Sequence, residues 1–557
     1  MGYFSFVREG TVFRLFRGPA IPLLIALLVA SACGPAATPA NTAPSGAAAT
    51  GAAAPTAAGA AGTLVYDADI SDLISLDPAV AYEFSGVLLV HNVYETLVRF
   101  EGSDLSTIKP GLAQTWEITD AGDHWAIVFH LRSGAKFASG NPLTADDVVF
   151  SLQRVMKLNK SPAFLLTDIA GLKPESITAT DPSTVSIKLP KTASPQAFLS
   201  VLTFTVGGVV DTKVVKSHDT GGDQGSAWML DHSAGSGPYA IDHWTKNAEV
   251  LLKANANYGG GAKPVLGAVL VKHVPESTNQ LFALEKGDAD VARNLSPQQL
   301  AALKGKPGVA IATGDSLLLI YVGMNVKVKP LDDVKVREAL RVAIDSKGIV
   351  NDLLKGNGKI VQDIVPAGLA GYNDAKPFQQ DVDKAKALLK DAGQDKVALE
   401  LLVPTGSAPG GVAWADLAAK LQADWAKIGV TVTIKQTTQA ELLTSYRAQK
   451  GQLVLILWGP DFPDPDANVG PFTDYKAKVI AFRNGWDDPI AEKSRAAALI
   501  TDPAKRVAAY KVITDYVLHN GPYAILYQPT EQFGLRSNVK GFAWSPMGWT
   551  DFATMSK

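Results

Sequence analysis

The chain has 557 residues, of which 47% are hydrophobic and 19% are charged, and its formal net charge is −2. This length and composition suit a globular protein of two or three domains. The near-neutral balance argues against a nucleic-acid-binding protein, which would carry a strong basic excess. The single cysteine excludes a framework of disulfides within the chain.

The N-terminal segment has the pattern of a bacterial secretion signal. Three arginines precede the apolar residues 21–30, and small residues follow at 31–32. A basic start, a short apolar run and small residues at its end are typical of a signal peptide. The run is shorter than the roughly 20 apolar residues of a transmembrane helix. We therefore predict a signal peptide over residues 1–32.

Cys33, the only cysteine, directly follows the predicted signal. Residues 30–33 (Ala-Ser-Ala-Cys) resemble the lipobox of bacterial lipoproteins, with alanine where leucine is usual. We predict that Cys33 is lipidated and anchors the protein to a membrane, since two or more acyl chains give stable anchoring. The alternative is ordinary signal cleavage beside an incidental cysteine. Residues 34–62 contain only small and uncharged residues, which predicts a flexible linker over 33–62.

The folded part is predicted to begin near Thr63. We expect a strand at 63–66, a helix running into a strand over 87–100, and a hairpin with strands at 116–118 and 125–131 around a turn at 120–123. Thr144 should cap a helix with Asp147 three residues on, as in a capping box. The apolar residues at 148, 152, 155 and 156 then form its buried stripe.

The C-terminal half alternates helix and strand. Apolar residues recur at helical spacing over 414–428, Gly429 ends that helix, and alternating residues over 430–434 predict a strand. Residues 453–457 are a continuous apolar run, which is typical of a strand buried on both faces. The predicted fold class is α/β.

Several sequence blocks resemble one known family in their order and spacing. They are Leu-Asp-Pro at 76–78, Asn-Val-Tyr-Glu-Thr-Leu-Val at 92–98, Pro-Gly-Leu-Ala-Gln-Thr-Trp at 110–116, Phe-His-Leu-Arg-Ser-Gly-Ala-Lys-Phe at 129–137, Pro-Leu-Thr-Ala-Asp-Asp-Val at 142–148, Gly-Ser-Gly-Pro-Tyr at 235–239, Gly-Asp-Ala-Asp at 287–290 and Val-Lys-Val-Arg-Glu-Ala-Leu at 334–340. The chain resembles the family 5 extracellular solute-binding proteins of ABC transporters, the dipeptide- and oligopeptide-binding group.

The resemblance implies a two-lobed clamshell of the type II periplasmic-binding-protein kind, with an extra subdomain and a hinge between the lobes. Lobe I would hold residues 63–104, 236–323 and 527–557, and the extra subdomain 105–235. Lobe II would hold 324–526, with the hinge crossings near Met324 and Tyr527. Closure about such a hinge is the usual response to a ligand.

The segment after the apolar strand 453–457 is the best candidate for the binding cleft. Trp458, Gly459 and Asp461 come directly after this strand, and in open α/β sheets ligands bind beyond the carboxyl ends of strands. The resemblance implies that Asp461 pairs with the α-ammonium group of a peptide through a charge-assisted hydrogen bond. The alternative for Asp461 is a turn-forming aspartate among prolines, and Asp464 and Asp466 are interpreted as turn and cap residues.

The opposite wall of the cleft is expected to come from lobe I. Tyr82, Glu83 and Phe84 match the segment whose backbone pairs with extended peptides in the family, and such pairing gives affinity without reading side chains. Plain core packing is the alternative for the two aromatic residues. No arginine for a peptide carboxylate is identified; Arg447 and Arg483 are candidates only by proximity in sequence.

The sequence lacks the motifs of common enzymes. It has no His-Glu-x-x-His, no Gly-x-Ser-x-Gly and no phosphate-binding P-loop, so no catalytic residue, metal site or cofactor is predicted. We expect a monomeric, lipid-anchored receptor on the extracytoplasmic side that captures peptides and delivers them to the permease and ATPase subunits of an ABC importer. The alternatives are a non-peptide solute (oligosaccharide, opine or metal chelate), a sensory receptor and, remotely, a secreted hydrolase that uses paired acids such as Glu83 and Asp461.

Overall fold

The computed structural model describes residues 62–394 and 396–557. The predicted signal peptide, Cys33 and nearly all of the predicted linker lie outside these residues. In the part of the chain that is described, no helix is both long and apolar enough to cross a membrane.

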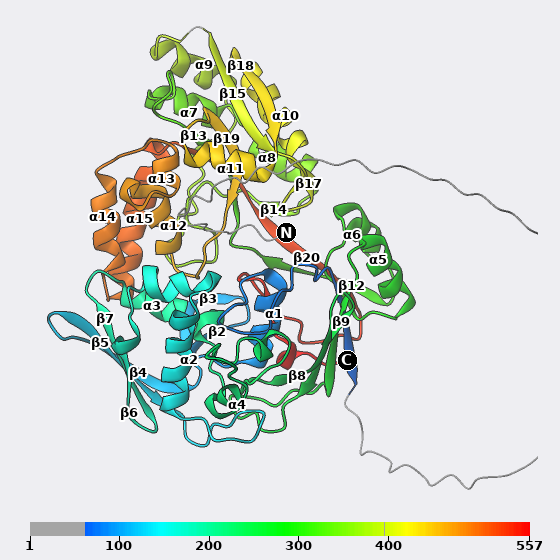
Figure 1. Ribbon diagram of the computed structural model, residues 1–557. Helices are drawn as coiled ribbons and strands as arrows, with labels where there is room; N and C mark the ends of the chain where they lie inside the picture. Colours follow the sequence, from blue (N-terminus) through cyan, green and yellow to red (C-terminus); the bar gives the residue numbers. More distant parts are fainter. Residues whose placement is uncertain (1–61, 395) are drawn as a thin grey trace, which may run out of the picture. The chain divides into compact units, whose positions relative to one another are not determined.

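A twelve-stranded mixed sheet runs through the molecule (Figure 1). Its main path is β18-β15-β19-β13-β20-β11-β1-β10-β9-β8, and β12 and β14 also pair with β20. The strands are β1 (Thr63–Ala68), β8 (Tyr239–Thr245), β9 (Glu249–Ala254), β10 (Ala268–His273), β11 (Val291–Ala292), β12 (Val309–Asp315), β13 (Leu319–Met324), β14 (Gly358–Lys359), β15 (Val397–Pro404), β18 (Val430–Thr437), β19 (Leu453–Trp458) and β20 (Tyr523–Arg536).

The long strand β20 joins the two halves of this sheet. Its first residues pair with β13, from Tyr523 to Tyr527, and its last seven pair with β12, from Thr530 to Arg536. We call β1 and β8–β12 the first half-sheet, and β13, β15, β18 and β19 the second half-sheet. A single strand therefore supplies hydrogen bonds to both half-sheets.

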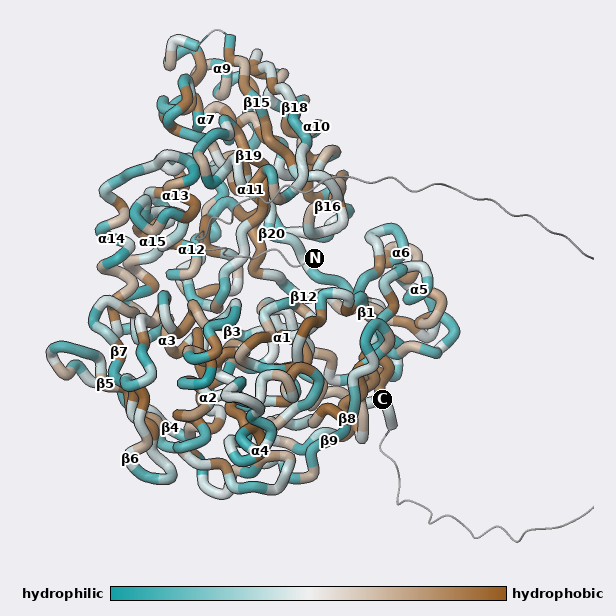
Figure 2. The backbone as a smooth tube through the Cα atoms, viewed as in Figure 1, coloured by the Kyte–Doolittle hydropathy of each residue, from teal (hydrophilic) through white to brown (hydrophobic). Residues whose placement is uncertain are grey.

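The second half-sheet follows from the apolar pattern of its sequence. Strand β19 is buried along almost its whole length, as the apolar run predicts, and Figure 2 shows hydrophobic residues along this region. Helix α10 (Trp414–Ala426) packs on β15 and β18, and Gly429 after it adopts a φ of +83°, a conformation that glycine adopts without strain. The predicted helix, stop and following strand are confirmed.

A separate four-stranded sheet lies in the region predicted as the extra subdomain. It has the order β4 (Ala113–Asp120), β5 (His124–Leu131), β7 (Thr184–Pro190), β6 (Ile177–Asp181), and β4 and β5 form the predicted hairpin. Helix α2 (Ala145–Leu158) begins with the predicted capping box, in which the backbone N–H of Thr144 donates to Asp147 Oδ2 at 2.9 Å. The predicted stripe from Val148 to Met156 is buried.

Further helices and short strands surround these sheets. The helices are α1 (Phe84–Val93), α3 (Pro195–Val201), α4 (Thr212–Ser217), α5 (Ser277–Lys286), α6 (Pro297–Leu303), α7 (Val334–Val342), α8 (Ser346–Gly348), α9 (Val382–Asp391), α11 (Gln439–Arg447), α12 (Asp466–Thr473), α13 (Ile480–Arg483), α14 (Ile490–Ala498) and α15 (Pro503–Asn520). The short strands pair as β2 (Val98–Glu101) with β3 (Asp104–Pro110), β16 (Ser407–Ala408) with β17 (Val412–Ala413), and β21 (Trp544–Ser545) with β22 (Trp549–Thr550).

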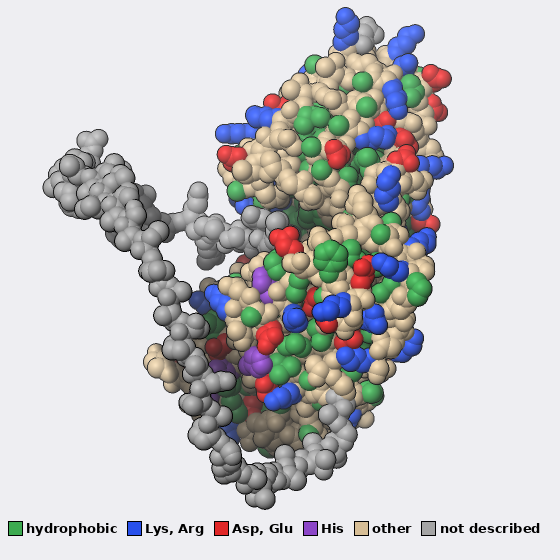
Figure 3. Space-filling model, turned by 90° about the vertical axis from the view of Figure 1, so that its right-hand side faces the viewer, with side chains coloured by type: hydrophobic (Ala, Val, Ile, Leu, Met, Phe, Trp, Pro, Cys, Tyr) green, Lys and Arg blue, Asp and Glu red, His purple; other side chains and the backbone are tan. Residues whose placement is uncertain are grey.

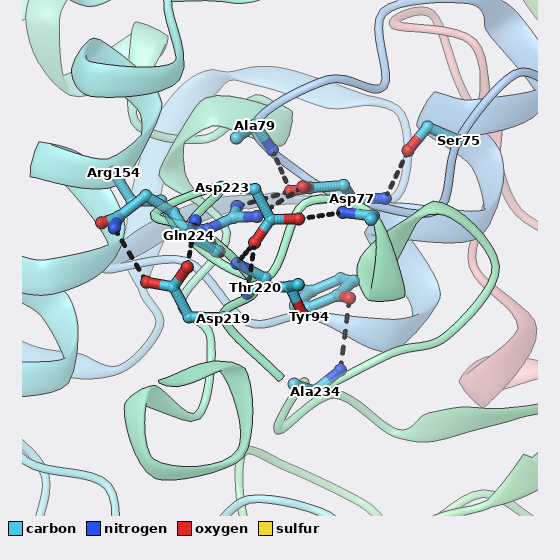
Figure 4. Close-up of polar contacts among 12 residues, drawn as sticks. Ser75, Asp77, Ala79, Tyr94, Arg154, Asp219, Thr220, Asp223, Gln224 and Ala234 are labelled. Carbon is cyan, nitrogen blue, oxygen red and sulfur yellow. Dashed lines mark hydrogen bonds and ion pairs between the residues drawn. The ribbon is translucent and has the colours of Figure 1, made fainter. Parts of the chain in front are cut away.

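A buried ion pair fastens α2 to the N-terminal segment. The guanidinium of Arg154 donates to both carboxylate oxygens of Asp77, at 2.7 and 2.6 Å, and its Nε donates to the carbonyl of Gln224 at 2.8 Å (Figure 4). Both charged side chains are 1% exposed. Such a pair resists the removal of either partner, since the other charge would stay buried and unpaired.

Candidate functional site

The loop after β19 occupies the position that the sheet topology favours for ligands. Strands β15 and β19 run parallel, with Leu401 beside Leu453, so their carboxyl ends lie at the same edge of the second half-sheet. Asp461 follows this edge by three residues. Crevices beyond such edges are the usual ligand sites of open α/β sheets.

Asp461 meets Tyr82 across this edge. The hydroxyl of Tyr82 donates a hydrogen bond to Oδ1 of Asp461, although 379 residues separate the two in sequence. Burial raises the pKa of Asp461 above the ordinary range of an aspartate, and the bond from Tyr82 lowers it in part. The side chain is nevertheless only half-buried. A carboxylate that is desolvated without being enclosed is expected in the wall of a cleft.

The ring of Tyr82 is held by two other aromatic side chains. It makes edge-on contacts with Phe164 and Phe204, at ring-centre distances of 6.1 and 6.0 Å. Burial, and then the charge of Asp461, raise the pKa of the Tyr82 hydroxyl, so the hydroxyl stays protonated and remains a donor. Tyr82 thus combines the two sequence interpretations: its ring packs against the core and its hydroxyl reaches the candidate site.

The neighbours of Tyr82 lie at the start of α1. The Tyr82 N–H donates to Oε2 of Glu83 at 3.2 Å, and the Glu83 carbonyl accepts from Val87 within the helix. The Tyr82 N–H and the Glu83 carbonyl are therefore already bonded within the chain. Phe84 is 47% exposed and lies beside Gly548, where an added Cβ would come within 3.1 Å of its ring. The exposed ring of Phe84 lies next to the turn between β21 and β22.

Trp458 and Gly459, at the start of the loop after β19, make packing contacts that hold this loop in place. The Trp458 side chain is 8% exposed, its Nε1 donates to the Ala467 carbonyl at 3.3 Å, and its ring meets Phe472 edge-on at 6.3 Å. At Gly459, a Cβ would lie 2.6 Å from a methyl group of Leu318. The structure places the Trp458 indole in the core, and Gly459 allows the close approach of Leu318.

Sequence reasoning missed the ion pair that fixes this loop. The guanidinium of Arg506 donates to both oxygens of Asp464, at 2.7 and 2.6 Å, and both residues are buried. Asp464 Oδ1 also accepts from the N–H of Asp466 at 2.9 Å, which is the turn role that the sequence suggested. A charged residue at a buried position of α15 was the one signal for this pair. The partner, 42 residues away, could not be found from spacing.

Arg447 and Arg483 lie toward the other end of β19. Tyr446, next to Arg447, and Asn484, next to Arg483, both lie beside Gly323. A Cβ added to Gly323 would be 2.6 Å from the Tyr446 hydroxyl oxygen and 2.7 Å from Asn484 Oδ1. Gly323 pairs with Val454, four residues before the end of β19, which is about 13 Å along a strand. Asp461 follows the opposite end, so these arginines are poorly placed to hold a short ligand together with Asp461.

The described residues contain no cluster of three or more His, Cys, Asp or Glu side chains that could hold a metal ion. The acidic side chains of the loop after β19 are instead committed to Tyr82, Arg506 and Tyr510. The chemistry that this site offers is hydrogen bonding and charge recognition at Asp461.

Comparison with known proteins agrees with this geometry. Residues 107–478 match the model of the bacterial extracellular solute-binding proteins, family 5. The chain belongs to this family. The probable D,D-dipeptide-binding periplasmic protein DdpA of Escherichia coli K12 is 30% identical over 485 residues, which cover 86% of this chain and 90% of that protein.

Two further relatives show the range of the family. Heme-binding protein A of Haemophilus influenzae is 28% identical over 491 residues, covering 83% of this chain and 86% of that protein. The structure of the ABC transporter-associated periplasmic binding protein DppA from Helicobacter pylori in complex with the peptide STSA matches with a TM-score of 0.69 and 25% identity, covering 89% of this chain and 98% of that one.

Family membership confirms the predicted fold class and places this chain among extracytoplasmic solute-binding proteins rather than enzymes. Figure 3 shows Lys and Arg interspersed with Asp and Glu on the face in view, with no area of a single charge sign. This mixed surface fits the near-zero net charge.

Proposed function

We propose that this protein is the peptide-binding receptor of an ABC importer. It captures a di- or oligopeptide at the edge that carries Asp461 and delivers it to a membrane permease driven by separate ATPase subunits. The observation that carries the proposal is the Asp461 carboxylate. Among the described residues its one hydrogen-bond donor is the neutral hydroxyl of Tyr82, and no cation is paired with it.

A peptide ammonium group is the natural partner for such a carboxylate. A desolvated carboxylate with a single neutral donor has unused acceptor sites and an uncompensated charge. An ammonium group supplies both a positive charge and several N–H donors, and such charge-assisted bonds are about twice as strong as neutral ones. The D,D-dipeptide-binding relative and the complex with the peptide STSA support a peptide as the ligand class.

A non-peptide solute is the second candidate. It is favoured by the relative named for heme binding and by the position of Arg447 and Arg483, which leaves neither of them near Asp461 for a short peptide's carboxylate. A sensory receptor would use the same fold. Genes for permease subunits beside this one would favour transport over sensing.

The lobe boundaries predicted from sequence form part of the proposal. Lobe I comprises residues 63–104, 236–323 and 527–557 with the subdomain 105–235, lobe II comprises 324–526, and the hinge lies near Met324 and Tyr527. The pairing of β20 with β13 at one end and with β12 at the other supports a crossing in this region. A lipid on Cys33 would keep the receptor close to its permease at high local concentration.

Ligand-dependent thermal stability of the purified protein tests the function. The probes are peptides of two to five residues with free termini and the same peptides N-acetylated. A peptide at 100 times its Kd should stabilise the fold by about 2.7 kcal/mol. Asp461→Asn should lower the stabilisation by free-amine peptides to the level of the acetylated peptides, and should leave the weaker effect of the acetylated peptides unchanged.

The matched control is Asp120→Asn, at an exposed hairpin residue, which should behave like the wild type. Equal losses for free and acetylated peptides in Asp461→Asn would contradict the ammonium role of Asp461. No stabilisation by any peptide would contradict the peptide-binding function.

A further inference from the structure

Two arginines of α7 are buried without a carboxylate partner. Arg337 and Arg341 are 6% and 4% exposed, and their spacing of four residues places them on the same face of the helix. Within residues 62–394 and 396–557, neither guanidinium makes an ion pair. The equally buried Arg154, in contrast, is paired with Asp77 by two short hydrogen bonds.

Both guanidinium groups instead donate hydrogen bonds to backbone carbonyls at the end of α15. Arg341 donates to the carbonyls of His519 and Gly521, each at 2.7 Å, and Arg337 donates to that of Asn520 at 2.7 Å. The dipole of a helix places about −0.5 elementary charge at its C-terminal end. This partial charge offsets only a fraction of two buried positive charges, and an uncompensated buried charge is costly.

Arg341 is the less compensated of the two cations. Burial, and then the charge of Arg337, lower the pKa of Arg341 to about 9, and Glu338 raises it in part. Glu338 is itself paired with Lys384 at 3.1 Å. Asp333, which raises the pKa of Arg337, precedes α7 and lies two helical turns before Arg341. The surroundings of Arg341 would therefore favour a further negative charge.

A small cavity lies directly beside Arg341. Its other polar lining residues are Ser346 of α8, Gln362 and Tyr523, and its volume is about 10 Å³, close to the space that one water-sized particle needs. Phe378 also lines the cavity, and the guanidinium of Arg341 lies 5.0 Å from the centre of its ring. The aromatic ring and the carbonyls of α15 together hold the guanidinium at the cavity wall.

The polar side chains of this cavity offer hydrogen-bond donors. Nε of Arg341 is buried and has no partner among the described residues. The Gln362 amide gives one N–H to the Phe378 carbonyl at 2.7 Å and its oxygen accepts from the Phe378 N–H at 3.1 Å, so its second N–H is unused. The Ser346 hydroxyl makes no hydrogen bond in the described part of the chain. Such a wall suits an anion, which only accepts, better than a water molecule, which must also donate.

We propose that this cavity binds a monatomic halide ion, chloride under physiological conditions, which neutralises Arg341. The small volume excludes polyatomic anions such as phosphate and sulfate. Tyr523 pairs with Gly323, and Gly323 pairs with Val454 near the start of β19, so the site lies toward the end of the second half-sheet that is opposite Asp461. The ion connects α7, α8 and β20, and it stabilises the fold independently of the proposed peptide binding.

Thermal unfolding of the purified full chain at different chloride concentrations tests this site. Sodium gluconate, whose anion is too large for the cavity, is replaced stepwise by sodium chloride at constant ionic strength. The Tm of the wild type should rise by about 1–3 °C and then level off, as mass action at one site requires. Sodium bromide should have the same effect. A Tm that does not rise, or that changes without levelling off, would overturn the proposal.

Two variants and a matched control assign the effect to this cavity. Ser346→Ala removes one donor and should raise the chloride concentration of half-maximal effect roughly 10-fold. Arg341→Met should remove the chloride dependence of Tm. The control is Ser277→Ala, because Ser277 is also a half-buried first residue of a helix with no side-chain hydrogen bond among the described residues, and it should match the wild type. A wild-type chloride response in both cavity variants would contradict the assignment.

Crystals of the wild type grown in sodium bromide locate the ion without any substitution, so they decide the question even if Arg341→Met does not fold. The anomalous scattering of bromine should give a peak within hydrogen-bond distance of Nε of Arg341. Electron density without an anomalous peak would identify a water molecule and overturn the proposal. A bromide peak with no effect of halide on Tm would show an adventitious ion only, which would overturn the stabilising role.

Discussion

The hydroxyl of Tyr82 and the carboxylate of Asp461 are joined by a hydrogen bond between the two parts of the chain that the sequence assigns to opposite walls of the cleft. In the absence of a ligand, the Tyr82 hydroxyl occupies one acceptor position of the Asp461 carboxylate, the candidate ammonium site. It also stabilises the ionised form of Asp461, because a donor lowers the pKa of the carboxylate that accepts it.

Tyr82→Phe should therefore change the pH dependence of ligand affinity. Ammonium binding requires ionised Asp461, so affinity is lost as the pH falls through the pKa of Asp461, which burial already raises. Without the Tyr82 donor this pKa rises further, and the loss of affinity should begin at a higher pH. Titrations of a free-amine peptide between pH 4 and 8 measure the midpoint, and a midpoint that stays fixed or moves to lower pH would contradict the role of Tyr82.

Arg154→Met should destabilise the protein strongly. The substitution leaves the Asp77 carboxylate buried without its partner, which costs about 3–5 kcal/mol. The matched control is Arg495→Met, since Arg495 contacts Asp474 at 2.7 Å but is 45% exposed. Removing such a surface pair costs about 0–1 kcal/mol. Chemical denaturation of both variants measures the free energy of unfolding that each loses. A loss for Arg154→Met as small as that for Arg495→Met would show that the Arg154–Asp77 pair is dispensable.

His91 should make the fold less stable as the pH falls below neutrality. Burial lowers its pKa from 6.5 to about 4, the nearby Asp551 raises it, and Arg99 lowers it. Between about pH 6.5 and 4 the unfolded state thus binds more protons at this residue than the folded state, so stability is lost as the pH falls through this window. His91→Gln should show a shallower decline of Tm from pH 7 to 5. If Tm declines equally in the variant and the wild type, protonation of His91 does not destabilise the folded state.

Cys33→Ser tests the predicted anchor, which lies outside the described residues. If Cys33 carries the lipid, the wild type should sediment with membranes and the variant should be released into the soluble extracytoplasmic fraction. Recovery of the variant in the membrane fraction would contradict the anchor and would leave the binding function untouched.

Local patterns in the sequence predicted much of the fold. The capping box of Thr144 and Asp147, the stop at Gly429 and the buried strand at 453–457 all rest on residues close in the chain, and the structure confirms each of them. Family resemblance supplied the two-lobed architecture, which no periodicity could give. Local rules could not supply the pairs joined by the tertiary fold.

The candidate site shows the same limit. The sheet rule identified Asp461 because the residue follows a recognisable strand. Tyr82 and Asp461 meet across 379 residues. Asp464 was interpreted as a turn residue because its partner, Arg506, belongs to a helix whose packing only the whole fold determines.

The position of β20 near the end of the chain has a consequence for how the molecule is built. Ile320 pairs with Tyr527 and Val309 with Arg536. Each half-sheet therefore needs a strand that lies more than 200 residues later in the sequence. Pairings this distant in sequence form slowly, because a long loop must close first. Neither half-sheet can be completed until residues 523–536 have left the ribosome and reached the compartment where the protein folds. A chain truncated before Tyr523 would lose the strand that both half-sheets share.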